Sequence, residues 1–182
     1  MSKMIILDRD GVINHDSDDY IKSPEEWMPI PGSLEAITLL KKAGYLVTIA
    51  SNQSGIARGL FSEQTLQDIH AKMTQLLAMR GVSIDGIYYC PHDPQANCIC
   101  RKPKSGMLIK IAQDFDIDLK QTPFVGDSIS DIKAAEMARA KPILLRTGKG
   151  EQVIQNNPEA ANVPVYDDLA HFVRDTLKSR LT

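Results

Sequence analysis

The sequence predicts an α/β protein with a Rossmann-like, mostly parallel sheet and helices on both faces. Two observations favour this fold. Short apolar runs alternate with longer segments whose apolar residues recur at helical spacing, and such alternation is typical of right-handed strand–helix–strand units. The chain has 182 residues and no repeat, low-complexity segment or linker. We therefore expect a single domain over residues 1–182.

The predicted strands are short apolar runs. In chain order they cover residues 4–7, 45–50, 86–89, 123–126, 142–145 and 163–166. Sheets of this kind bind ligands beyond the carboxyl ends of their strands. The residues that follow these runs are therefore the place to look for a functional site.

The predicted helices have apolar residues at helical spacing. They cover residues 33–43, 62–80, 105–115, 128–138 and 167–178. Ser33, Ser62 and Ser128 begin three of these helices and are predicted N-caps, because a serine hydroxyl accepts a hydrogen bond from a first-turn amide. Gly44 and Gly81 are predicted to end the first two.

The composition excludes several classes of protein. Apolar residues make up 43% of the chain, charged residues 24%, and the net charge is −2, which is typical of a globular protein and gives no support to nucleic-acid binding. No apolar run approaches a membrane span, and the N-terminus does not resemble a signal peptide. We expect a cytoplasmic monomer without nucleic-acid or membrane partners.

Acidic residues follow two of the predicted strands. Asp8 and Asp10 lie in LDRDG, after the first strand, and Asp127 follows residues 123–126. Carboxylates that converge in this way suit Mg²⁺. The alternative is a turn in which Asp8 and Asp10 only accept backbone hydrogen bonds. Asp131, in the first turn of the next helix, is explained by the helix dipole.

Polar and basic residues complete the predicted site. Ser51 and Asn52 follow the second strand, in ASNQSG, and offer donors to phosphate oxygens. Arg101 and Lys102, in CRKPKSG, supply the cations that a phosphate beside carboxylates requires. A short basic run is more often a solvated surface. Four strand-end clusters of compatible chemistry together favour one phosphate site.

All three cysteines lie close to a histidine. Cys90, His92, Cys98 and Cys100 are the ligand set of a closed, structural zinc site. A cysteine nucleophile with His92 as its base is the alternative, but it explains only two of the four residues. The loop has little apolar material to order it, so metal ligation supplies that energy. We predict a zinc-binding loop over residues 90–100.

With these motifs assembled, the chain resembles the haloacid dehalogenase superfamily of phosphatases, in its zinc-loop branch. LDRDGVIN, SNQSGIARGLFSE, the CxH and CxCRKPKSGM segments and VGDSISDI carry the resemblance, which spans roughly residues 4–147. It implies the haloacid dehalogenase fold. We expect no separate cap domain, because no long insertion follows Asp10 or separates Ser51 from Lys102.

The resemblance also implies roles in a reaction. Asp8 is the expected nucleophile, which forms an aspartyl-phosphate, and Asp10 the general acid and then the base. Asp10 is expected to need a pKa raised by its surroundings. Ser51 and Lys102 are expected to stabilise the transferring phosphoryl group.

The remaining implied roles concern ligands. Magnesium is expected on the Asp8 side chain, the Asp10 backbone carbonyl and Asp127, and Asn52 and Arg101 are expected to recognise the substrate. The implied activity is magnesium-dependent hydrolysis of a small phosphorylated sugar, a sugar bisphosphate, with histidinol phosphate as the alternative substrate. A zinc-stabilised interaction module without turnover is the alternative outside enzymes.

Overall fold

The structure is a computed structural model that describes residues 3–179. Six strands form one sheet in the order β3-β2-β1-β4-β5-β6, and every neighbouring pair is parallel. The strands are β1 (Met4–Leu7), β2 (Leu46–Asn52), β3 (Gly86–Cys90), β4 (Pro123–Gly126), β5 (Lys141–Leu145) and β6 (Val165–Tyr166). The predicted parallel α/β fold is confirmed.

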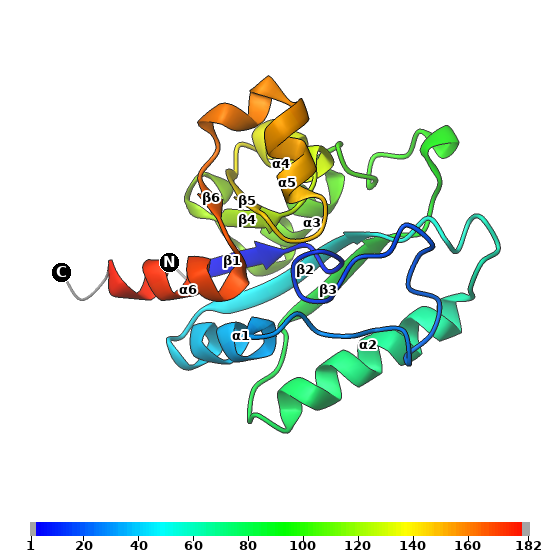
Figure 1. Cartoon of the computed structure of the whole chain (residues 1–182), viewed down its shortest axis with the longest axis horizontal. Helices are drawn as coiled ribbons and strands as arrows, with labels where there is room; N and C mark the ends of the chain where they lie inside the picture. The colour runs from blue at the N-terminus through cyan, green and yellow to red at the C-terminus, as the bar shows by residue number, and fades with distance from the viewer. Residues whose placement is uncertain (1–2, 180–182) are drawn as a thin grey trace.

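Helices cover both faces of this sheet (Figure 1). The helices α1 (Ser33–Lys42), α2 (Glu63–Ala78) and α6 (Leu169–Lys178) share one apolar core with the sheet, and α3 (Gly106–Phe115) and α4 (Ile129–Ala138) share the core on the other face. The remaining helical segments are α5 (Gly150–Asn156), η1 (Pro94–Ala96), η2 (Leu119–Gln121) and η3 (Pro158–Asn162). Among the described residues, no helix is long and apolar enough to span a bilayer.

The central strand β1 shows why its sequence is continuously apolar. Ile5 and Leu7 belong to the core beneath α1, α2 and α6, whereas Met4 and Ile6 belong to the core beneath α3 and α4. Successive side chains of a strand point to opposite faces, so a strand covered on both sides needs an unbroken apolar run. Each such buried side chain contributes about 1.5–3 kcal/mol.

The sheet brings the predicted acidic residues together. The strand β1 lies between β2 and β4, so the chain winds in opposite directions from this point, where doubly wound sheets bind their ligands. Leu7 pairs with Val125, and the Asp8 amide donates to the Val125 carbonyl at 2.8 Å. Asp8 and Asp127 therefore leave adjacent strand ends on the same edge.

Two of the three predicted N-caps are confirmed. The Ser62 hydroxyl accepts from the Thr65 amide at 3.0 Å. Ser128 and Asp131 form a reciprocal capping box at the start of α4. The predicted stops Gly44 and Gly81 follow α1 and α2 with positive φ angles.

The prediction that Ser33 is an N-cap is wrong. Gly32 is the N-cap of α1, and Ser33 is already inside the helix, where its hydroxyl donates to the Ile13 carbonyl at 2.6 Å. A hydrogen bond to a loop 20 residues earlier in the chain replaces the local cap. The serine thus ties α1 to the segment that follows β1.

Two of the differences from the sequence prediction concern β2 and α5. The strand β2 continues through Ser51 and Asn52, which pair with Tyr89 and Cys90 of β3, although polar side chains suggested that the strand had ended. The seven-residue helix α5 was not predicted. It is too short to show a clear helical period.

Candidate active site

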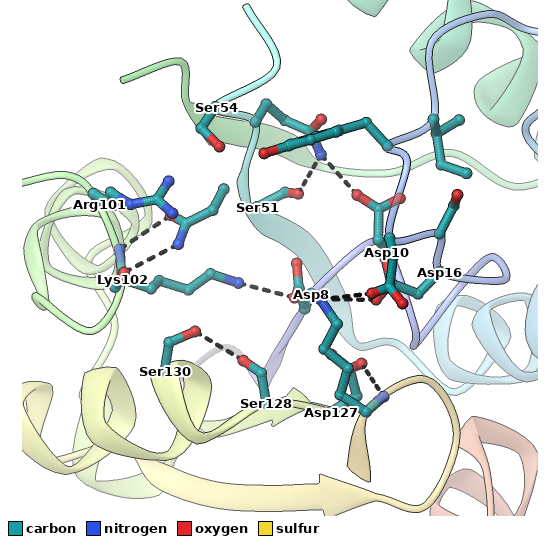
Figure 2. A pocket seen from close by; sticks show the side chains of 17 residues that line it. Asp8, Asp10, Asp16, Ser51, Ser54, Arg101, Lys102, Asp127, Ser128 and Ser130 are labelled. Carbon is teal, nitrogen blue, oxygen red and sulfur yellow. Dashed lines mark hydrogen bonds and ion pairs between the residues drawn. The ribbon is translucent and has the colours of Figure 1, made fainter. Parts of the chain in front are cut away.

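A pocket of about 280 Å³ opens at the carboxyl ends of β1, β2 and β4 (Figure 2). Its lining includes every residue predicted for the phosphate site: Asp8, Asp10, Ser51, Asn52, Arg101, Lys102 and Asp127. Residues from the segment after β1, including Asp16, Asp18 and Tyr20, form part of its wall. The strand-end clusters therefore share one cavity.

Asp8 lies at the base of this pocket and is only 9% exposed. One carboxylate oxygen accepts from the Arg9 amide at 2.7 Å, and the other is 3.0 Å from Lys102 Nζ. Burial raises the pKa of Asp8 to about 7, against the attraction of Lys102 and with the support of the Asp131 and Asp10 charges. The Asp8 carboxylate is thus a buried anion among other anions.

The carboxylates of Asp8, Asp127 and Asp131 crowd together. Each contributes one oxygen to a cluster in which these atoms lie within 4.8 Å of one another. Burial raises the pKa of Asp127 well above its usual value, and the charges of Asp131 and Asp8 raise it further. Hard oxygen donors that repel one another in this way fit a magnesium ion. The three carboxylates are therefore candidate ligands for such an ion.

Lys102 is a buried cation of the site, with 2% exposure. Its ammonium contacts Asp8 at 3.0 Å, Asp131 at 2.6 Å and the Ala50 carbonyl at 2.9 Å. Burial alone lowers the pKa of Lys102, but the Asp131 and Asp8 charges raise it above its ordinary value. The amine is therefore a fixed positive charge directed at Asp8 (Figure 2).

Asn52 holds the backbone that carries this lysine. Its side-chain oxygen accepts from the Lys102 amide at 3.1 Å, and its side-chain nitrogen donates to the Lys102 carbonyl at 3.0 Å. This reciprocal pair links the end of β2 to the loop after the cysteines. Asn52 therefore positions Lys102, a role that the sequence did not indicate.

The Asp10 carboxylate accepts four hydrogen bonds. Arg9 forms a fork on it, from Nε at 3.0 Å and Nη2 at 2.9 Å, while Asn14 Nδ2 donates at 2.8 Å and Gln53 Nε2 at 2.9 Å. Burial by itself raises the pKa of Asp10, but Arg9, Asn14 and Gln53 together lower it. In the free protein the surroundings of Asp10 therefore do not supply the raised pKa that a general acid calls for, chiefly because Arg9 is a charged neighbour.

Ser51 and Arg101 occupy the wall of the pocket nearest to Lys102. The Ser51 hydroxyl is buried and accepts from Gln53 Nε2 at 2.7 Å. The Arg101 side chain is partly exposed and donates from Nη1 to the His92 carbonyl at 3.1 Å. Figure 2 shows both residues beside the Lys102 side chain.

The cysteines and His92 form a second cluster, beside the pocket. Cys100 Sγ lies 3.1 Å from Cys90 Sγ, 3.3 Å from Cys98 Sγ and 3.5 Å from His92 Nδ1. These separations are too long for disulfides, and all three cysteines are free. One nitrogen and three sulfurs around a common centre suit tetrahedral zinc. The predicted zinc loop is compatible with this geometry.

Several contacts in the site were not expected from the sequence. Arg9 is fully buried between the two predicted aspartates, and Gln53 contacts both Asp10 and Ser51. Asp131 binds Lys102 in addition to capping α4. Lys149 donates its amide to Asp127 at 2.8 Å. For Arg9, the available signal was its position, a charge flanked by two acids directly after an apolar strand.

A doubly wound sheet with paired aspartates after its first strand and a buried lysine at the switch point defines a hydrolase of the haloacid dehalogenase class. A family model described as "HAD-hyrolase-like" matches residues 99–172. The match covers the segment that contains Lys102, Asp127 and Asp131.

Comparison with known proteins identifies a narrower family within this class. A D-glycero-beta-D-manno-heptose-1,7-bisphosphate 7-phosphatase of Pseudomonas putida is 50% identical over 175 residues, which are 96% of this chain and 99% of that protein. The crystal structure of D,D-heptose 1,7-bisphosphate phosphatase from Bordetella bronchiseptica, complexed with magnesium and phosphate, has a TM-score of 0.95 and 47% identity, covering 97% of this chain and 99% of that one. The enzyme of the same name from Burkholderia thailandensis has a TM-score of 0.77 and 41% identity over the same shares.

The chain therefore belongs to the D-glycero-beta-D-manno-heptose-1,7-bisphosphate 7-phosphatase family within the haloacid dehalogenase superfamily. It is a phosphoric monoester hydrolase.

A glycine beside Asp127 offers a first test of the site. Gly11 has a φ of +80°, and a Cβ atom there would lie 2.1 Å from Asp127 Oδ2. We expect Gly11→Ala to displace that carboxylate and to lower kcat/KM by about 10²-fold. Steady-state kinetics and a magnesium titration measure this effect.

Gly44→Ala is the matched control. Gly44 has the same φ of +80° but no atom within 4 Å of an added Cβ. Both variants carry a left-handed backbone cost of about 1–2 kcal/mol, but we expect only Gly11→Ala to lose activity. Equal activities of the two variants would show that the position of Asp127 is unimportant.

Proposed function

We propose that this chain is a magnesium-dependent phosphatase that removes the 7-phosphate of D-glycero-D-manno-heptose 1,7-bisphosphate through an aspartyl-phosphate intermediate. The names of its close relatives support the substrate. The observation that carries the mechanism is the buried Lys102 ammonium, 3.0 Å from Asp8, whose carboxylate clusters with those of Asp127 and Asp131. A nucleophile, a fixed cation and a metal-type cluster share one pocket.

In the first half-reaction, an Asp8 carboxylate oxygen attacks phosphorus. The bond from phosphorus to the heptose 7-oxygen breaks, and that oxygen takes a proton from Asp10. A carboxylate and a phosphate dianion repel each other, so positive charge must be in place before they meet. Lys102 supplies it from one side, and the buried Ser51 hydroxyl offers a further hydrogen bond to a phosphoryl oxygen.

In the second half-reaction, Asp10 takes a proton from water as the water oxygen attacks the aspartyl-phosphate, releasing phosphate and restoring Asp8. The lowered pKa of Asp10 keeps it ionised and ready for this step. For the first step Asp10 must carry a proton. A substrate phosphate placed beside the carboxylate adds a like charge, which raises the pKa of Asp10 as the complex forms.

Magnesium is proposed on the Asp8 side chain, the Asp10 backbone carbonyl and Asp127. When bound, it supplies the positive charge that offsets repulsion between these carboxylates and the phosphate. The raised pKa values of Asp8 and Asp127 support this assignment, since both carboxylates lack sufficient compensation from protein cations.

Structural zinc is proposed on the second cluster, on Cys90, His92, Cys98 and Cys100. With all four ligands supplied by the protein, no coordination position is left for water or substrate. The ion is proposed to fix the loop rather than to take part in phosphoryl transfer.

Arg101 is proposed to recognise the substrate, with Asn52 acting mainly through Lys102. The product would be a heptose 1-phosphate, which we propose feeds nucleotide-activated heptose for the lipopolysaccharide core. That the chain acts as one cytoplasmic domain, as a monomer and without nucleic-acid or membrane partners, stays a prediction.

A phosphate-release assay tests the proposal. We expect kcat/KM for heptose 1,7-bisphosphate to exceed that for histidinol phosphate by about 10²-fold or more, because a site built for sugar hydroxyls leaves buried polar groups unpaired with the imidazole compound. Product analysis should show the 1-phosphate retained. A preference for histidinol phosphate, or turnover that persists in excess chelator, would contradict the assignment.

A further inference from the structure

Arg9 is a charged residue that the reaction as described does not use. Its side chain is fully buried, with 0% exposure. A buried guanidinium is costly unless its donors are satisfied. Since the side chain is closed off from the pocket, Arg9 does not contact substrate and acts through its neighbours.

One neighbour of Arg9 is the Asp10 carboxylate. The fork from Nε and Nη2 reaches both oxygens of Asp10, at 3.0 and 2.9 Å. Paired parallel hydrogen bonds fix the plane of a carboxylate as well as its position. The orientation of Asp10 therefore depends on the orientation of the guanidinium behind it.

The other neighbour of Arg9 is His70, on α2. His70 Nε2 lies 3.3 Å from Arg9 Nη1, and the ring is buried on the helix face that also carries Ile69 and Met73. A guanidinium only donates hydrogen bonds, so Nε2 must be the acceptor and Nδ1 carries the proton. Burial, with the Arg9 charge, lowers the pKa of His70 to about 4, which keeps the ring neutral and able to accept.

We infer that His70 is a positioning residue for the general acid: it holds the Arg9 guanidinium in the plane that directs the Asp10 carboxyl group at the leaving oxygen. The inference rests on the proposed function in one respect, the role of Asp10 as the acid. A residue 61 positions from Arg9 in the chain thereby sets the alignment of the proton donor.

The chemistry of the leaving group separates this role from general support of the fold. A sugar alkoxide is a poor leaving group and must be protonated as its bond to phosphorus breaks, whereas a nitrophenolate departs as a stable anion. Misaligned general acid catalysis therefore slows the sugar ester selectively. A loosened fold or a damaged metal site slows both esters alike.

The experiment compares kcat/KM for heptose 1,7-bisphosphate and for 4-nitrophenyl phosphate, because this constant reports the steps through phosphoryl transfer to Asp8. We expect His70→Leu, which removes the acceptor, to lower the ratio of the two constants by at least about 10-fold. His70→Gln places an oxygen near the position of Nε2 and should keep the ratio within about 2-fold of wild type.

Two further variants complete the design. His70→Asn keeps a polar group but is too short to reach Arg9, so it should lower the ratio like His70→Leu and replaces that variant if the leucine protein does not fold. His171→Leu is the matched control, since His171 lies on α6 and contacts Asp167 at the surface. Its ratio should equal that of wild type.

The outcomes distinguish this inference from the proposed function. An unchanged ratio in His70→Asn or His70→Leu, with wild-type enzyme active on both esters, would overturn the positioning role alone. If the ratio were unchanged because both constants had fallen equally, the role of His70 would be structural. If the wild-type enzyme hydrolysed 4-nitrophenyl phosphate but not the heptose ester, the proposed substrate would fail instead.

Discussion

Asp8→Asn is expected to lower kcat on the order of 10⁴-fold or more while leaving the fold at least as stable. The amide cannot form the aspartyl-phosphate, so the covalent route is lost. Stability should not fall, because Asp8 is one of three crowded carboxylates and Lys102 keeps its contact with Asp131 at 2.6 Å. Removing one negative charge relieves repulsion in the cluster.

The difference in stability between Asp8→Asn and the wild-type protein should depend on pH. The pKa of Asp8 is raised from its ordinary 3.8 to about 7 in the folded protein. Between these values the folded state binds more protons at this residue than the unfolded state, so the Asp8 contribution to stability falls as pH rises through this window. In magnesium-free buffer, the Tm of Asp8→Asn relative to wild type should therefore increase from about pH 4 to pH 7.

Thermal melts across this pH range, with and without magnesium, and phosphate-release kinetics check the prediction. Asp68→Asn is the control, because Asp68 is an exposed carboxylate on α2 that contacts Gln64. Its Tm should follow wild type at every pH. Near-normal turnover by Asp8→Asn would remove Asp8 from the nucleophile role, and a Tm difference that shrinks with rising pH would contradict the repulsion argument.

The sequence was informative where one residue sufficed to indicate chemistry. Asp8 and Asp127 follow apolar strands, and parallel strands end on the same edge, so pattern and topology alone predict that these carboxylates share a site. The strand β1 itself has the predicted bounds, because a run buried on both faces is unbroken. The N-caps Ser62 and Ser128 were also predicted correctly, because each depends only on residues of its own helix.

The sequence was uninformative where a role depends on a distant partner. Asp131 has the ordinary appearance of a helix-start acid, and its contact with Lys102 exists only because the fold brings the first turn of α4 next to that lysine. The Ser33 hydroxyl donates to the Ile13 carbonyl instead of capping α1. The lowered pKa of Asp10 follows from the fork of Arg9, whose conformation no local pattern specifies.

Removal of the proposed zinc is expected to damage activity without removing a reacting group. Arg101 donates to the His92 carbonyl, and Lys102 lies two residues beyond Cys100, so the cysteine–histidine cluster and Lys102 share one loop. A ligand set of this kind supplies much of the ordering energy of a polar loop. We expect Cys98→Ala to lower Tm on the order of 10 °C and kcat/KM by about 10²-fold.

Ile99→Ala is the matched control, because Ile99 lies between two of the cysteines and its side chain is 79% exposed. It should retain zinc, measured by elemental analysis, and normal kinetics. A zinc-selective chelator, applied in excess magnesium, should reproduce the defect of Cys98→Ala in the wild-type protein, whereas a catalytic thiolate would be lost only by mutation. Lys102 keeps a second anchor in Asn52, so part of the activity should survive. A zinc-free protein with unchanged kinetic constants would show that Asn52 alone positions the lysine and that the cysteine loop is dispensable for catalysis.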